Sequence, residues 1–201
     1  MAATPFEPKK TALLLLDLQV GFLSHLPSET SASVLDNAAS AISTARQNGA
    51  QVAYIRAALD AAEVAAIPDH APAFSAFKSS EEVGAAIHPD AATTQIHAKV
   101  APKDGDMFYR KIRFGTFMRD PSKALLDEFR AKGIDTIVIG GVITSGAVLS
   151  AVRQLADLDF RLVLLEDCCA DYDVEVHKML CEKVFPKQAK VIKSSELGGL
   201  F

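Results

Sequence analysis

Short apolar runs alternate with longer amphipathic segments along most of the chain. Nearly continuous apolar or β-branched runs are typical of strands buried on both faces. Strands are predicted at 11–16, 51–55, 107–110, 136–139, 161–165 and 189–192. Helical spacing of apolar residues predicts helices at 30–48, 121–132, 145–158 and 174–184. Gly49 and Gly133 follow the first two of these helices, as is typical of helix ends.

This alternation predicts βαβ units, and therefore an α/β fold with a parallel sheet and helices on both faces. Residues 57–105 break the pattern, because they are rich in Ala, Pro and Asp and show no clean period. We interpret them as a long excursion with short helices that borders or covers a pocket. No internal repeat or linker is found, and 201 residues suit one domain over 1–201.

Composition and charge narrow the classes of function. Apolar residues make up 49% of the chain and charged residues 23%, which is an ordinary globular balance. The formal net charge of −4 lacks the basic footprint of nucleic-acid binding. The apolar run at 11–16 is too short to span a membrane, and it leads into Asp17 rather than a cleavage site. We therefore expect no membrane partner and a cytoplasmic location, with leaderless secretion left open.

The cysteine and histidine patterns favour packing over chemistry. Three cysteines without a CxxC pair argue against a disulfide framework. Cys168 and Cys169 follow a predicted strand and Cys181 lies on a helix face, so we expect all three to be buried. None of the five histidines has the spacing of a zinc site, and we expect no metal.

In parallel α/β sheets, ligands bind beyond the carboxyl ends of the strands. The candidate site residues are those that follow each predicted strand: Asp17, Arg56, Lys111, segment 140–147 and segment 166–169. Asp17 follows an apolar run without the polar first turn of a capped helix. Lys111 is interleaved with apolar residues, and a lysine in such surroundings needs an acidic partner. Asp17 is the predicted partner, although a turn-forming aspartate and a surface lysine are the simpler readings.

The segment 140–147, GGVITSGA, leads from a buried strand into a helix. Its two glycines permit tight backbone geometry, and a helix start offers free N–H groups to an anion or oxyanion. The simpler reading is a strand–helix turn capped by Thr144 or Ser145. The segment is neither GxGxxG nor a P-loop, and Ser145 lacks a GxSxG setting.

Three motifs in register, TALLLLDLQVGFL, KIRFGTF and GGVITSGAV, resemble the isochorismatase-like hydrolases of the cysteine hydrolase superfamily. The similarity extends from about residue 10 to about residue 190. It implies a three-layer, Rossmann-like sheet of six parallel strands and a triad of Asp, Lys and Cys. Asp17 matches the family aspartate in its D-x-Q-x-x-F setting, and Lys111 matches the lysine.

The cysteine of the resemblance falls at Ala147. A methyl group cannot attack a carbonyl, so thiolate chemistry is not available there. The run TSGAVLSAVR resembles a branch of the family that lacks the cysteine, which favours a natural alanine over an engineered one. Isochorismatases also lack this cysteine and cleave a vinyl ether by protonating its methylene carbon. The resemblance therefore implies Asp17 as a general acid.

The leading hypothesis is hydrolysis of isochorismate or a similar small anionic substrate, without a cofactor. The alternatives are a cysteine-type amidohydrolase with its nucleophile replaced at Ala147, and a non-catalytic small-molecule-binding protein. As family members often assemble, a homo-oligomer (dimer or tetramer) is expected, and so is a non-proline cis peptide near Val142–Ile143. The residues expected to contact substrate are Gln19, Phe22, Arg56, Arg113, Phe117, Val142, Ile143, Ser145 and Gly146.

Overall fold

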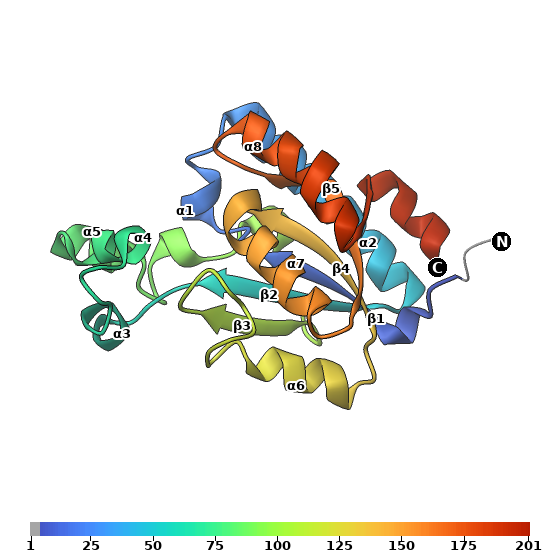
Figure 1. Cartoon of the computed structure of the whole chain (residues 1–201), viewed down its shortest axis with the longest axis horizontal. Coiled ribbons are helices and arrows are strands. Elements are labelled where there is room, and N and C mark those ends of the chain that lie inside the picture. Colours follow the sequence, from blue (N-terminus) through green and yellow to red (C-terminus); the bar gives the residue numbers. More distant parts are fainter. Residues whose placement is uncertain (1–4) are drawn as a thin grey trace.

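A computed structural model describes residues 5–201 and contains one sheet of six parallel strands (Figure 1). The strand order is β3-β2-β1-β4-β5-β6, which is the Rossmann-like order that the resemblance implied. The strands are β1 (Thr11–Leu16), β2 (Gln51–Ala57), β3 (Met107–Lys111), β4 (Thr136–Val142), β5 (Arg161–Ala170) and β6 (Lys190–Ile192). The predicted parallel α/β sheet is therefore confirmed.

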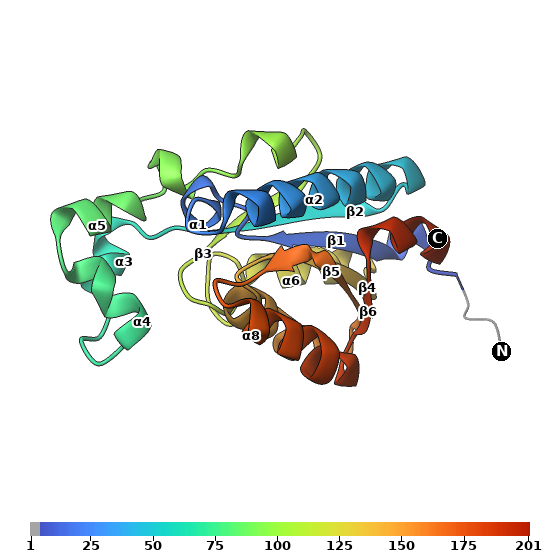
Figure 2. The same ribbon diagram turned by 90° about the horizontal axis from the view of Figure 1, so that it is seen from above.

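Helices cover both faces of the sheet, as Figure 2 shows from above. On one face, α2 (Ser28–Asn48) packs its apolar stripe against the strands, and Gly49 ends it in the left-handed conformation. The other face is covered by α6 (Ala124–Ala131), α7 (Leu149–Ala156) and α8 (Val174–Met179). Within residues 5–201, no helix is both long and apolar enough to cross a membrane.

Several boundaries differ from the prediction. Strand β5 continues to Ala170, because a register shift after Ile139 lets Gly141 and Val142 pair with Cys169 and Ala170. Helix α6 begins at Ala124 rather than 121, since a turn that includes Pro121 precedes it. The helix predicted from 145 starts as a wide turn, Thr144–Val148, which leads into α7. The short helix α1 (Val20–Leu23) was not predicted.

The predicted excursion is present, and we call residues 58–95 the arm. It holds α3 (Ala61–Ala65), α4 (Pro72–Ser75) and α5 (Glu81–Ala86), and projects beyond the sheet in both views (Figures 1 and 2). Leu59, Ile67 and Ile87 form a small core of its own. The arm begins where β2 ends, so it stands at the carboxyl edge of the sheet.

Gly141 is required by the close approach of β4 to β1. Its φ is 134°, and a Cβ built there would lie 2.1 Å from the carbonyl oxygen of Leu16. Leu16 directly precedes Asp17, so this contact sets the distance between the aspartate and the turn after β4.

We expect Gly141→Ala to lower the free energy of unfolding by about 3 kcal/mol or more, because backbone atoms must move apart. Urea denaturation of the purified variant measures this. Gly199→Ala is the control, since a Cβ there meets nothing within 4 Å. Equal free energies of unfolding for the two variants would contradict the requirement for glycine at position 141.

Candidate active site

A cavity of about 170 Å³ lies where β1, β2 and β3 end, between the turn after β4 and the arm. Its wall is largely apolar, and its charged side chains are Asp17, Lys111 and Arg113. The arm contributes Leu59, Ala73, Phe74, Phe77 and Ile87 to this wall. The expectation that the excursion borders a pocket is therefore confirmed. A concave, mostly apolar site with a few polar groups is typical of small-molecule binding.

Asp17 and Lys111 form the predicted ion pair, with Lys111 Nζ 2.6 Å from Asp17 Oδ2. Both side chains are almost entirely buried, with 6% and 2% exposed. Lys111 Nζ also donates a hydrogen bond to the carbonyl oxygen of Phe114, at 3.2 Å. Asp17 has a φ of 54°, in the left-handed region that aspartate tolerates better than most residues. Burial of both charges makes each dependent on the other.

The environment of Asp17 raises the pKa of its carboxyl group above the ordinary value. Burial raises the pKa of this carboxyl group, and the charge and hydrogen bond of Lys111 oppose the rise only in part. Lys111 occupies Oδ2, whereas Oδ1 is buried and has no hydrogen-bond partner among residues 5–201. A proton on Asp17 therefore belongs on Oδ1. Asp17 lines the cavity, so its carboxyl group is placed to act as a general acid toward a ligand bound there.

Ala147, to which the family resemblance assigned the cysteine position, is buried in the cavity wall. The predicted non-proline cis peptide is present between Val142 and Ile143. We expected the amides of Ser145, Gly146 and Ala147 to be free for an anion, and this is wrong for Ser145 and Gly146. The Ser145 N–H donates to Asp171 Oδ2 at 2.7 Å, and the Gly146 N–H donates to the carbonyl of Ile143 at 3.0 Å. Neither amide is therefore free to bind an anion.

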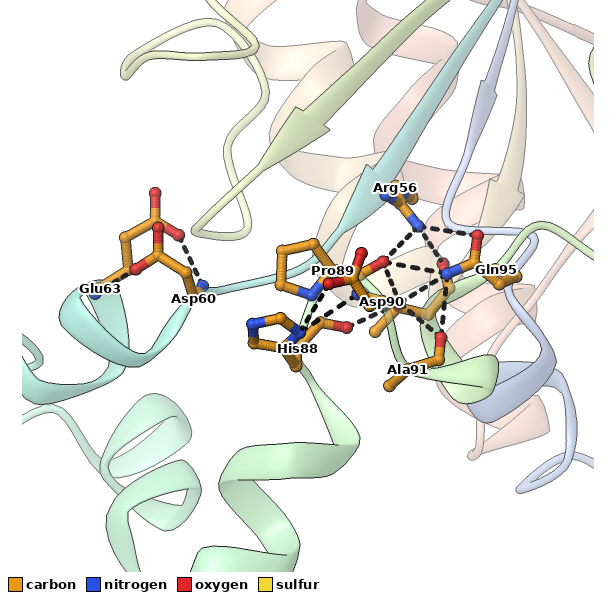
Figure 3. A network of polar contacts seen from close by, with 9 residues as sticks. Arg56, Asp60, Glu63, His88, Pro89, Asp90, Ala91 and Gln95 are labelled. Carbon is orange, nitrogen blue, oxygen red and sulfur yellow. Dashed lines mark hydrogen bonds and ion pairs between the residues drawn. The ribbon is translucent and has the colours of Figure 1, made fainter.

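Arg56 does not line this cavity, so the structure does not bring it together with the other predicted substrate contacts. Its guanidinium donates to the carbonyl of Pro89 and to Gln95 Oε1, both at 3.0 Å (Figure 3). It also stands 5.4 Å from the ring centre of Phe108. Through these contacts Arg56 holds the end of the arm against β2.

Four other predicted contacts are also absent from the wall. The Gln19 side chain pairs with the N–H and C=O of Ala57 and donates to the carbonyl of Thr94, so it joins the end of β2 to the arm. Phe117 and Val142 are packed in the core, and Ser145 is exposed. The predicted contacts that do line the cavity are Phe22, Arg113, Ile143 and Gly146.

Segment 166–169 belongs to β5 instead of following it. Cys168 and Cys169 are buried as predicted, and so is Cys181. Burial raises the pKa of each thiol, which disfavours the reactive thiolate. None of the three lines the cavity.

Gln154 on α7 supports the site, although sequence reasoning gave it no role. Its Oε1 accepts the Phe117 N–H at 3.1 Å, and its amide group packs so closely on Gly115 that a Cβ there would lie 2.3 Å away. These contacts hold the loop that presents the Phe114 carbonyl to Lys111. The sequence carries no signal for Gln154, because its role depends on packing between segments that are distant along the chain.

The chain belongs to the isochorismatase family, since the model of the isochorismatase domain matches residues 11–196. It is therefore an isochorismatase-family hydrolase. A probable isochorismatase of Pseudomonas chlororaphis is 28% identical over 98% of this chain and 89% of its own length. The isochorismatase family protein YecD of Escherichia coli O157:H7 is 30% identical over 94% and 95%.

A solved structure shows the same fold. The cysteine hydrolase of Pseudomonas syringae pv. phaseolicola superposes with a TM-score of 0.82 over 100% of both chains, at 16% identity.

We expect Lys111→Met to lower the free energy of unfolding by about 3 kcal/mol near pH 8, because it leaves the Asp17 carboxyl buried without its partner. Asp17 already has a raised pKa in the folded chain, and losing Lys111 raises it further. In this variant Asp17 ionises at lower pH in the unfolded chain than in the folded chain. The loss in the free energy of unfolding therefore grows as pH rises, and it vanishes below the pKa of aspartate in the unfolded chain. Urea denaturation across pH measures this.

The double variant Asp17→Asn/Lys111→Met is the control. It removes both charges, so we expect it to regain most of the lost stability and to show little pH dependence. A double variant that is less stable than Lys111→Met at pH 8 would contradict a coupled pair.

Proposed function

We propose that the protein hydrolyses the vinyl ether of isochorismate, or of a similar small anionic substrate, with Asp17 as the general acid. The observation that carries the proposal is a buried carboxyl group, with a raised pKa and one unpartnered oxygen, that faces a cavity with a methyl group at the nucleophile position. Such a site is suited to proton transfer and not to covalent catalysis. The relative named a probable isochorismatase agrees with this chemistry.

The reaction begins with transfer of the proton from Asp17 Oδ1 to the methylene carbon of the vinyl ether. The π electrons form the new C–H bond, and the ether oxygen stabilises the cation that remains. Water then adds to the cationic carbon and returns a proton to Asp17. The hemiketal breaks its bond to the ring oxygen, which takes up the hydroxyl proton, and releases pyruvate and a ring alcohol. One water molecule is consumed.

Lys111 supports this cycle through its contact with Asp17 Oδ2. Its ammonium group stabilises the carboxylate that remains after proton transfer, so that Asp17 can act next as the base for water. When Asp17 is protonated, the wall of the cavity has a net positive charge, which comes from Lys111 and Arg113. A substrate with carboxylate groups balances that charge, whereas a neutral substrate does not.

We expect the protein to release pyruvate from isochorismate and Asp17→Asn to lower kcat by about 10²- to 10⁴-fold, since the amide has no acidic proton to give. A coupled lactate dehydrogenase assay measures pyruvate. Asp90→Asn is the matched control, because the Asp90 side chain is exposed and does not line the cavity. Pyruvate release that is no greater than with Asp17→Asn would exclude isochorismate as the substrate.

The pH profile tests the role of Asp17 separately. If the protonated form is active, kcat/KM is constant at low pH and falls about tenfold per pH unit above the pKa of Asp17. A carboxylate acting only as a base gives the opposite slope. A profile that rises with pH would therefore contradict the general-acid assignment.

The amidohydrolase alternative has a specific observation in its favour. Ala147 lines the same cavity as Asp17 and Lys111, so a thiol at this position would face both groups. A non-catalytic binding role is disfavoured, because a pocket used only for its shape gains little from a buried charged pair.

Ala147→Cys distinguishes these readings. Under our proposal the variant gains no hydrolysis of small amides or carbamoyl compounds, measured as ammonia release, and keeps a lowered but detectable vinyl-ether hydrolysis. Amide hydrolysis that appears in Ala147→Cys and is abolished by iodoacetamide would favour the amidohydrolase. Ligand-induced thermal stabilisation without turnover of any substrate would favour the binding protein.

A further inference from the structure

Three side chains of the cavity wall, those of Phe74, Arg113 and Phe114, contact one another in a cluster. Phe74, on α4 of the arm, packs edge-on against Phe114 with ring centres 4.9 Å apart. The guanidinium of Arg113 lies 5.0 Å from the centre of the Phe74 ring. Phe114 in turn reaches the turn after β4, where its ring would lie 3.4 Å from a Cβ on Gly146. We call Phe74, Arg113 and Phe114 the roof.

Arg113 differs from the other arginines around the arm. Arg110 forms an ion pair with Glu63, and Arg56 donates hydrogen bonds to carbonyl and amide oxygens of the arm. Arg113 forms no ion pair within residues 5–201, and one of its nitrogens donates to the carbonyl of Ile112 at 2.6 Å. Its remaining N–H groups are available to a ligand, and it is the cation of the cavity wall that Asp17 does not pair with.

We propose that Phe74 is a specificity-determining residue, which holds Arg113 as the receptor for a carboxylate group of the substrate. The substrate class comes from the proposed function, and the roof adds the place where one carboxylate group of that substrate binds. An arginine presents a planar fork of donors that matches a carboxylate, and stacking on an aromatic face holds that plane in place. The face of Phe74 therefore turns a flexible side chain into a preorganised receptor.

The root of the arm fixes Phe74 in this position. Arg110 holds the start of the arm through the carbonyl of Ala58, at 2.9 Å, and through Glu63. Arg56 holds its end through Pro89 and Gln95 (Figure 3). The N–H of Leu59 also donates to the carbonyl of Ile87, at 2.9 Å, which closes the arm on itself. Phe74 is thus carried by a segment that is anchored at both ends.

Binding of benzoate and benzamide tests the proposal without turnover. The two compounds share size and ring shape, but only benzoate carries a charge. Isothermal titration measures both with the unmodified protein, Arg113→Gln, Phe74→Leu and the double variant. Phe77→Leu is the matched control, because Phe77 also lines the cavity from the arm but has no arginine over its ring.

We expect the unmodified protein to bind benzoate more tightly than benzamide. Arg113→Gln should weaken benzoate binding about tenfold and leave benzamide binding nearly unchanged. Phe74→Leu keeps an apolar wall but loses the aromatic face, so it weakens benzoate about threefold to fivefold and benzamide by less than twofold. The double variant binds benzoate no more weakly than Arg113→Gln. Phe77→Leu affects the two compounds equally.

Three results would overturn the proposal: no preference for benzoate, an unchanged preference in Arg113→Gln, or an equal loss of both compounds in Phe74→Leu. The proposed function fails independently. If isochorismate yields no pyruvate while the charge preference still depends on Phe74 and Arg113, the vinyl-ether hydrolysis is wrong and the carboxylate receptor stands.

Discussion

The buried ion pair between Asp17 and Lys111 joins the ends of two strands that do not touch each other. Asp17 follows β1 and Lys111 ends β3, with β2 between them in the sheet. Removing two charges from water is costly, and a close, well-oriented contact is required to offset that cost. The surrounding structure supplies this geometry through Gly141, which lets β4 approach β1, and through Gln154, which holds the loop after Lys111. The pair therefore constrains how the strand ends are arranged, in addition to any role in catalysis.

The parts of the fold that the sequence predicts are those governed by local patterns. The apolar run before Asp17 and the glycine after α2 mark their elements directly, because strand burial and helix termination act within a few residues. The Asp17–Lys111 contact was predicted from two signals: both residues come at the carboxyl ends of parallel strands, and the apolar residues around Lys111 require an acidic partner. The cis peptide between Val142 and Ile143 was predicted mainly from the family resemblance.

The residues that sequence reasoning misplaced or missed depend on contacts between distant segments. Arg56 follows a strand, as site residues do, but the arm returns to it and takes up its donors. Ser145 begins a helix, yet Asp171 from beyond β5 occupies its amide. Phe74 gave no periodic signal, because α4 is a single turn in a segment without a regular pattern. Local patterns cannot show which polar group a distant segment will satisfy.

The small core of the arm has a consequence for how this fold diversifies. Leu59, Ile67 and Ile87 pack with one another and not with the main cores on either face of the sheet. Changes in the arm, away from the points where Gln19, Arg56 and Arg110 hold it, are therefore expected to affect the main cores little. An insertion or replacement there can reshape the wall around an unchanged acid and lysine. Such modularity allows a lineage to exchange one substrate for another by small steps, each of which leaves a folded protein.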